Sequence, residues 1–177
     1  MTQANGVLKR AASVAASGYR RFIRVLEWLI PVFDLSVRLY LAHIFWTGGM
    51  VKLSSWISTV MLFTMVYDVP LLSPEHAAYL ATAIELGGSV LLAIGLGGRW
   101  AALSLFGLNV VATISYGQLS EAALKEAFYW GVLFLYFVLH GPGLLSADAL
   151  LRYLIRRKKL INIADEDVPS QAALRRE

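Results

Sequence analysis

The sequence predicts an all-α integral membrane protein, a four-helix bundle with an extra short interfacial helix between spans one and two. Hydrophobic residues make up 58% of the 177 residues, and charged residues make up 16%, well below the roughly 25% of soluble domains. Several apolar runs approach the roughly 20 residues that an α-helix needs to cross a hydrocarbon core of about 30 Å. The length fits one small bundle without a second globular domain.

Composition divides the chain into three parts. Residues 1–27 are polar and basic, and we expect a cytoplasmic or interfacial tail, either a short surface helix or a disordered segment. Residues 28–148 form the predicted bundle. Residues 149–177 begin with a basic stretch, which predicts a surface helix followed by a disordered tail.

The first predicted span, residues 35–53, carries ionisable side chains at bilayer depth, where each charge costs about 2.5–3.5 kcal/mol. One face of this helix, by helical spacing, holds Arg38, Phe45, Gly49 and Lys52. The opposite face, which suits lipid, holds Leu39, Ile44, Trp46 and Val51. His43 lies off the charged face. The charged face is therefore predicted to turn inward, toward other helices.

The next two elements follow from length and capping signals. Residues 57–72 are apolar but short, which favours an interfacial or re-entrant helix over a full crossing. Ser73 is then a predicted N-cap, with Pro74 at the first helical position. The second span covers residues 78–96 and carries Glu85. Small residues of this span recur at seven-residue steps, which lets another helix approach closely. They are Ala81, Gly88 and Gly95.

Polar and aromatic residues mark the last two spans. The third span covers residues 101–119 and contains Asn109 and Tyr116. A short acidic connection leads to the aromatic fourth span, residues 127–145. That helix is expected to end after His140 at a Gly-Pro-Gly sequence, because proline breaks helices.

Charge distribution predicts the orientation. Lys and Arg concentrate before the first span and after the last, and Arg99 lies in the turn between spans two and three. The positive-inside rule then places both termini on the cytoplasmic side. We expect the protein itself in the inner membrane of the cell. Termini on one side require an even number of crossings, and four fits.

Counting residues from each interface estimates the depth of each polar side chain in the membrane, and the depths predict two clusters. Lys52 and Glu85 would pair near the outer side, since a lysine stem reaches several ångströms. Arg38, His140 and Asp148 would form a cluster near the inner side. The alternatives are structural: Lys52 could extend to the interface, Arg38 could anchor there and His140 could cap its helix.

Asn109 and Tyr116 complete the predicted polar set, and Asn109 could equally hold two helices together. The chain has no cysteine, which excludes thiolate chemistry and iron–sulfur clusters on its own residues. No ligand spacing supports a metal site, and His43 and His140 lie at different depths for a haem. The basic residues lie mostly in the tails, so we expect no nucleic-acid partner.

The order of these residues resembles a known family. The pattern comprises Arg38, Phe45, Gly49 and Lys52, then Glu85 with Gly87 and Gly88, then Gly141, Pro142 and Gly143 followed by Ser146 and Asp148. Across about residues 35–148 it is similar to the DoxX family of small bacterial and archaeal membrane proteins.

The resemblance implies a four-helix membrane bundle and roles for Arg38, Gly49, Lys52 and Glu85, and less directly for the Gly-Pro-Gly turn and Asp148. The family takes its name from the membrane subunit of a thiosulfate:quinone oxidoreductase. Other members resemble accessory proteins of oxidative-stress or metal-handling operons. The absence of cysteine argues against direct sulfur chemistry on this chain.

Two functions are compatible with these observations. The first is a membrane subunit or accessory of a quinone-linked redox system, with the electron-donating chemistry on another polypeptide. The second is a non-enzymatic scaffold, assembly factor or small transporter. The candidate ligand-binding or buried polar cluster is Arg38, Lys52, Glu85, Asn109, Tyr116 and His140; the expected helix-packing residues are Gly49, Gly88 and Gly95. Catalytic residues stay unassigned. The expected partners are the lipid bilayer and another subunit, with a second copy of the chain as an open alternative.

Overall fold

The computed structural model describes residues 2–67, 69, 71–117 and 119–166. Within these residues the chain is all-helical, with six helices and no strand, which confirms the predicted all-α class. The helices are α1 (Thr2–Ser54), α2 (Trp56–Met65), α3 (Pro74–Ile94), α4 (Gly98–Ser115), α5 (Glu121–His140) and α6 (Ala147–Glu166).

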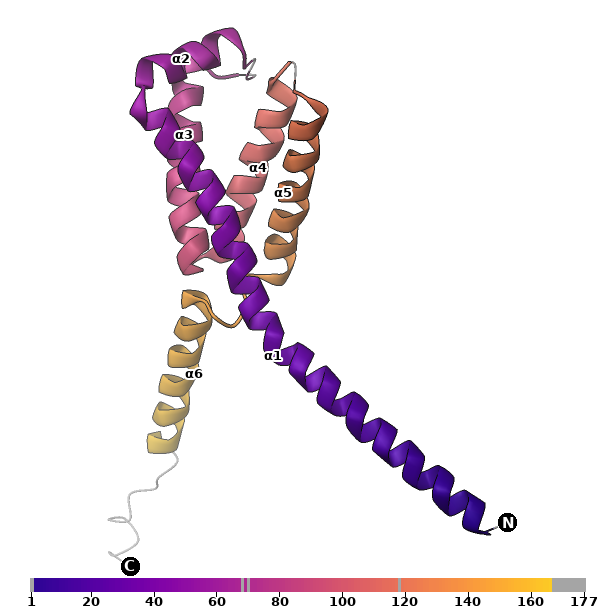
Figure 1. Cartoon of the computed structure of the whole chain (residues 1–177). Coiled ribbons are helices and arrows are strands. Elements are labelled where there is room, and N and C mark those ends of the chain that lie inside the picture. Colours follow the sequence, from indigo (N-terminus) through magenta and orange to yellow (C-terminus); the bar gives the residue numbers. More distant parts are fainter. Residues whose placement is uncertain (1, 68, 70, 118, 167–177) are drawn as a thin grey trace, which may run out of the picture.

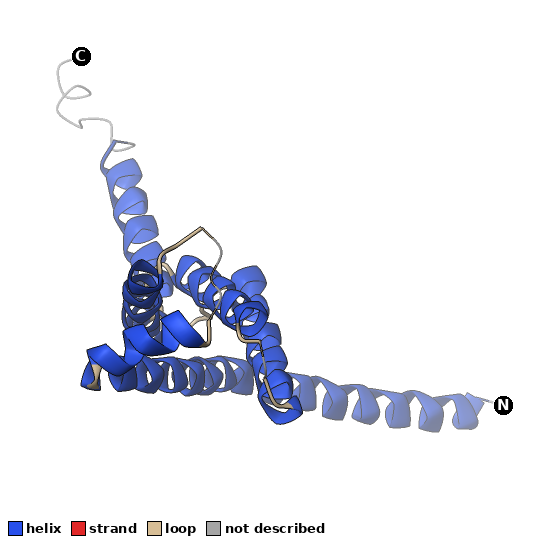
Figure 2. Ribbon diagram, turned by 90° about the horizontal axis from the view of Figure 1, so that it is seen from above, coloured by secondary structure: helices blue, strands red, loops and turns tan. Residues whose placement is uncertain are grey.

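The helices form one bundle with two projecting arms (Figure 1). The C-terminal half of α1 packs on α3, α3 packs on α4 and α4 packs on α5. The short α2 lies across one end of this bundle (Figure 1). The N-terminal half of α1 and the whole of α6 leave the bundle at the opposite end and point in different directions (Figure 2). Both arms of the chain therefore emerge at the same end.

Helix α1 is longer than the sequence indicated. The expected tail and the expected first span belong to one continuous helix, Thr2–Ser54, with Pro31 inside it. Residues 1–27 are rich in alanine and arginine, which favour helix but give no apolar run. Hydropathy therefore separates a helix from a disordered tail poorly; the segment is helical, but as the first part of α1 and not as a separate short helix.

The predicted short helix and the start of α3 agree with the structure. Helix α2 ends at Met65, earlier than residue 72; Asp68 and Pro70, expected to end it, lie outside the described residues. Ser73 is the N-cap of α3 and its hydroxyl accepts a hydrogen bond from the His76 N–H at 3.5 Å, with Pro74 at the first helical position. The predicted helix start is confirmed.

The start of α5 corrects the predicted acidic connection. Residues 121–126 are not a loop, because α5 begins at Glu121. Ser120 is its N-cap and accepts a hydrogen bond from the Ala123 N–H at 3.2 Å, while Glu121 in the first turn complements the helix dipole. Helix α5 ends at His140, where the Gly-Pro-Gly turn was expected to end it, although the predicted span ran on to residue 145. Helix α4 is displaced in the same way, from 101–119 to Gly98–Ser115.

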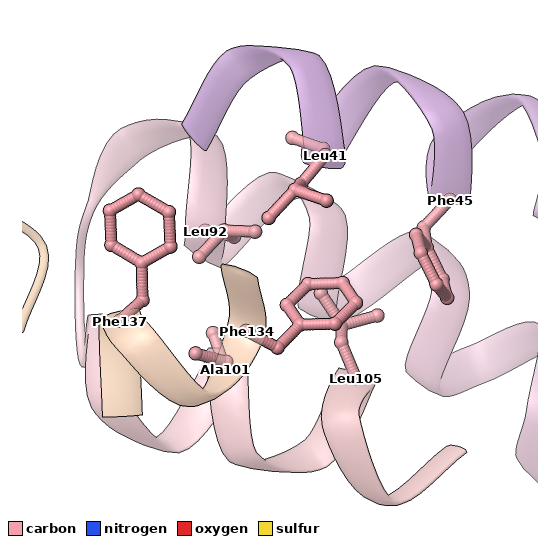
Figure 3. Close-up of a cluster of buried hydrophobic side chains, with 9 residues drawn as sticks. Leu41, Phe45, Leu92, Ala101, Leu105, Phe134 and Phe137 are labelled. Carbon is pink, nitrogen blue, oxygen red and sulfur yellow. The ribbon is translucent and has the colours of Figure 1, made fainter. Parts of the chain in front are cut away.

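The core lies where four helices meet (Figure 3). It contains Leu41 and Phe45 from α1, Leu92 from α3, Leu105 from α4, and Phe134 from α5. The Phe45 ring meets the Phe134 ring edge-on at a centroid distance of 4.9 Å. Edge-to-face contacts of this kind add about 0.5–1.5 kcal/mol to the packing.

The inward face of α1 follows the prediction. Arg38, Phe45 and Gly49 are buried, and Lys52 is largely buried. Three residues of the predicted outward face are exposed: Leu39, Trp46 and Val51. Ile44 is the exception, since it packs against the core.

Two helices, α3 and α5, are long and apolar enough to cross a membrane by length and composition. The four-span prediction is not confirmed on this criterion. The other two bundle helices carry polar groups along their length: α1 carries Asp34, Arg38 and Lys52, and α4 carries Arg99 and Asn109. Helix α6 forms the predicted helix after the bundle. Disorder was expected from Asp165 on, but Asp165 and Glu166 still belong to α6, and residues 167–177 lie outside the described residues.

Candidate functional site

An ion pair joins the end of α1 to the middle of α3. The Lys52 Nζ lies 2.6 Å from Glu85 Oε1 and 2.7 Å from Glu85 Oε2. The two side chains are only 18% and 12% exposed. Charges so poorly hydrated require a partner, and the structure supplies the partner that the sequence predicted.

Two glycines let α1 and α3 approach closely enough for this pair. A Cβ added at Gly49 would lie 2.7 Å from the Leu86 side chain and 3.2 Å from Glu85 Cβ. A Cβ at Gly48 would meet the Glu85 carboxylate at 3.6 Å. Small residues at helix contacts serve this purpose in membrane bundles, so these glycines help to position Glu85.

Beside the ion pair lies the α2-end pocket, a cavity of about 370 Å³ between α2, α3 and α4. Its walls are mostly apolar, from residues such as Phe63, Leu80 and Leu108. The polar groups that line it are Lys52, Tyr67, Glu85 and Ser104. An apolar cavity of this size with a few convergent polar groups is typical of a small-molecule site.

Two tyrosines lie at the rim of this pocket. Tyr67 lines it and forms an isolated antiparallel bridge with Tyr116. The two rings meet edge-on at a centroid distance of 5.3 Å. Burial raises the pKa of Tyr67, and negative neighbours add to the effect, so its hydroxyl stays protonated. Tyr116 therefore belongs to this end of the bundle, one side chain removed from the pocket.

Asn109 is held elsewhere. Its Nδ2 donates a hydrogen bond of 2.8 Å to the Ala127 carbonyl, which links α4 to α5. It lines a separate cavity of about 500 Å³ between those two helices. The structure thus places Asn109 apart from Glu85, in the helix-joining position that was the alternative interpretation.

Arg38 lies at the other end of the bundle and is 1% exposed. Its Nη1 donates to the Pro142 carbonyl, and its Nη2 donates to the Leu145 carbonyl at 2.7 Å. Its Nε has no hydrogen-bond partner among the described residues. Arg38 therefore fixes the turn between α5 and α6, far from the Lys52–Glu85 pair.

The predicted partners of Arg38 are close to it but bond to other groups. The Asp148 carboxylate accepts hydrogen bonds from the Gly97 and Gly98 N–H groups at 2.9 and 3.0 Å, at the start of α4. His140 is exposed and stacks on Tyr136 at a centroid distance of 4.9 Å. The predicted polar residues thus divide between the two ends of the bundle.

Asp34 was missed by the sequence analysis. It is buried, and its Oδ1 accepts a hydrogen bond of 2.8 Å from the Tyr136 hydroxyl. Its position, four residues before Arg38, puts both side chains on one helix face. That spacing was the signal that could have identified it.

Two other predicted packing glycines also lie at close contacts. A Cβ at Gly88 would lie 2.9 Å from Leu105 Cγ. Gly95 has a φ of 73°, and a Cβ there would lie 2.6 Å from Ser146 Cβ and 2.7 Å from Arg38 Nη1. Gly95 therefore combines a left-handed turn with contact to the α5–α6 connection.

Within the described part of the chain, no group of three His, Asp or Glu side chains could hold a metal ion. His43 is exposed and borders a shallow cavity against α3, away from His140.

Comparison with known proteins identifies one family. Residues 33–118, from α1 to just beyond α4, match the DoxX family. The chain contains a DoxX domain. No curated protein and no solved structure matches the chain.

The matched region contains both partners of the Lys52–Glu85 pair and the whole lining of the α2-end pocket. The matched region ends before α5. The Gly-Pro-Gly turn and Asp148, which the resemblance included, therefore lie outside the match. The DoxX match and the apolar helices α3 and α5 together point to a membrane protein.

Proposed function

We propose that this DoxX protein binds a quinone, or a small molecule of similar shape, in the α2-end pocket as the membrane subunit of a redox system. The observation that carries the proposal is the composition of the pocket. Apolar walls suit a flat ring, and the Lys52–Glu85 pair supplies charged groups to the lining. Such a site matches the mostly apolar lining with few polar groups that lipophilic ligands require.

The residues present fit a quinone. Gly107 lines the pocket, and a Cβ added there would meet nothing within 4 Å, so open space lies above it. Lys52 has donors for a carbonyl oxygen, and the hydroxyl of Tyr67 can donate as well.

A bound quinone supplies two-electron, two-proton redox chemistry, and the protein supplies binding, orientation and electrostatics. Lys52 Nζ would bind a ring oxygen and stabilise negative charge on it. Glu85 would hold a proton on its carboxylate beside that oxygen. Phe63 and Leu108 would flank the ring and exclude water.

We further propose four membrane crossings, formed by α3, α4, α5 and the C-terminal half of α1. The packing of these helices in one bundle supports this arrangement, as does the exit of both arms at one end (Figure 1). The basic residues of both arms then place that end, with both termini, at the cytoplasmic face of the inner membrane. Helix α2 lies at the outer face.

The electron donor in this proposal is another polypeptide. The chain has no cysteine, and its glycine-rich turn lacks the preceding strand that a dinucleotide fingerprint requires. Its own groups therefore serve the ligand rather than a second redox centre.

The test is a titration of the purified full-length protein with a short-chain ubiquinone, followed by tryptophan fluorescence, together with extraction of co-purified quinone. Saturable binding, lost when the pocket is filled from Gly107, is the expected result. A preparation without bound quinone that also fails to bind the added compound would refute the proposal.

A second function is favoured by the geometry of the ion pair. Both Glu85 oxygens lie within 2.7 Å of Lys52 Nζ, so the pair can serve as a lock between α1 and α3 in a scaffold, assembly factor or transporter. Under this alternative, Glu85→Gln would lower stability, and filling the pocket would change nothing that the protein does.

A further inference from the structure

We propose that the protein also binds an anionic phospholipid, in a cavity at the end of the bundle from which α6 leaves. This α6-end cavity has a volume of about 680 Å³. It lies between α1, the start of α4, the α5–α6 turn and the start of α6. It shares no lining residue with the α2-end pocket, so it is a separate site.

Two arginines line this cavity from different helices. Arg99, at the start of α4, uses Nη2 in a hydrogen bond of 3.2 Å to the Leu139 carbonyl. Arg152, on α6, is exposed. A guanidinium has five N–H donors, so Arg99 retains donors for a phosphate, and Arg152 faces the same space.

The acidic residues of the cavity are mostly engaged. The Asp34 carboxylate accepts the Tyr136 hydroxyl, and both Asp148 oxygens accept N–H groups of the α4 start. Glu27 is the remaining acid in the lining. Arg99 and Arg152 are the arginines that line the cavity, so it offers guanidinium donors to a ligand beside these acids.

Apolar side chains share the lining with these charges. Trp100 and Leu144 are 74% and 76% exposed, and Ile30 is 50% exposed. Tryptophan is enriched at membrane–water interfaces, where one side of the ring is apolar and the other is hydrated. A ligand with an anionic head and apolar chains satisfies both kinds of surface.

The charge around the cavity favours an anionic lipid over a zwitterionic one. Beyond Arg152, the described part of α6 continues with four basic residues: Arg156, Arg157, Lys158 and Lys159. Its first-turn acid, Asp148, is already bonded to the start of α4. Basic residues near an anionic membrane surface are attracted to it.

The experiment is native mass spectrometry of the full-length protein in detergent, with phosphatidylglycerol or phosphatidylcholine added. The variants are Arg152→Gln and Arg99→Gln, and the matched control is Lys125→Gln, an exposed basic residue at the opposite end of the bundle. Arg152 is exposed on α6, so Arg152→Gln keeps the test valid if Arg99→Gln fails to fold.

We expect phosphatidylglycerol to bind in preference to phosphatidylcholine. Each arginine variant should weaken that binding roughly fivefold, the equivalent of about 1 kcal/mol, and Lys125→Gln should leave it unchanged. Equal binding of the two lipids, or equal loss in all three variants, would overturn the proposal. Competition by soluble glycerol phosphate at the same concentration would overturn the lipid assignment in favour of a free phosphate.

Discussion

Lys52 and Glu85 bind each other through both carboxylate oxygens, at 2.6 and 2.7 Å. This contact joins α1 to α3, the two helices of the bundle that pack most extensively on each other. Both side chains also form part of the wall of the apolar pocket. A change at either residue therefore affects helix packing and the pocket together, and the predictions below separate the two effects.

Glu85→Gln should lower the stability of the protein by about 1–3 kcal/mol. It leaves the Lys52 ammonium poorly hydrated and without its counter-ion; a fully buried pair would cost 3–5 kcal/mol, and the partial exposure reduces this. The measurement is thermal unfolding in detergent. As a control, Lys125→Gln removes an exposed ion pair with Glu121 (3.7 Å) and should change stability by less than about 0.5 kcal/mol.

The double variant Lys52→Met, Glu85→Leu should recover most of that loss, because an apolar pair of similar volume removes the cost of burying charge. If Glu85→Gln alone leaves the unfolding temperature unchanged, the ion pair does not hold α1 against α3.

Gly107→Leu should weaken ubiquinone binding by about tenfold or more. The new side chain enters the space above Gly107 in the α2-end pocket, where a Cβ has no neighbour within 4 Å. Gly87→Leu is the matched control, since a Cβ at Gly87 also meets nothing within 4 Å but points away from the pocket. Equal affinity in the two variants would place the ligand elsewhere.

Gly49→Ala should destabilise the bundle by about 1–3 kcal/mol, because its Cβ would lie 2.7 Å from the Leu86 side chain. Gly87→Ala, on the exposed side of α3, should be neutral or stabilising, since alanine favours helix by up to about 1 kcal/mol over glycine. Thermal unfolding of both variants measures the contrast. An equal response would mean that α1 can move away from α3 without cost.

Asp148→Ala should cost about 0.5–2 kcal/mol through the loss of its bonds to the Gly97 and Gly98 N–H groups. Asp148→Asn keeps one acceptor oxygen and should cost less. Hydrogen exchange at the first turn of α4 gives the local readout. Unchanged protection there in Asp148→Ala would show that other groups cap the helix.

Side-chain chemistry at particular positions made much of the fold predictable. The Ser73–Pro74 start and the Gly-Pro-Gly stop after His140 were found because capping residues and proline act locally. The start of α5 was missed although Ser120 gave the same signal, because its first turns are polar and resemble a loop in hydropathy. The continuity of α1 through Pro31 was missed because residues 1–27 also give no apolar run.

The site was less predictable than the fold. Lys52 and Glu85 could be matched because counting residues from the outer interface puts Glu85 within reach of a lysine side chain at the end of the first span. Asn109 donates to a backbone carbonyl of α5, and Arg38 donates to one in the α5–α6 turn. The sequence does not show which carbonyl lies opposite each side chain. The pocket itself depends on space above Gly107, which only the packing of α3 against α4 reveals.

The exit of α6 and of the N-terminal half of α1 at one end of the bundle has a practical consequence (Figure 1). Under the proposed four crossings, reporter domains fused beyond the two arms would share a compartment, while a label on α2 would be reached from the other side. The protein can thus be tethered at two points from one side, with its α2 face left open.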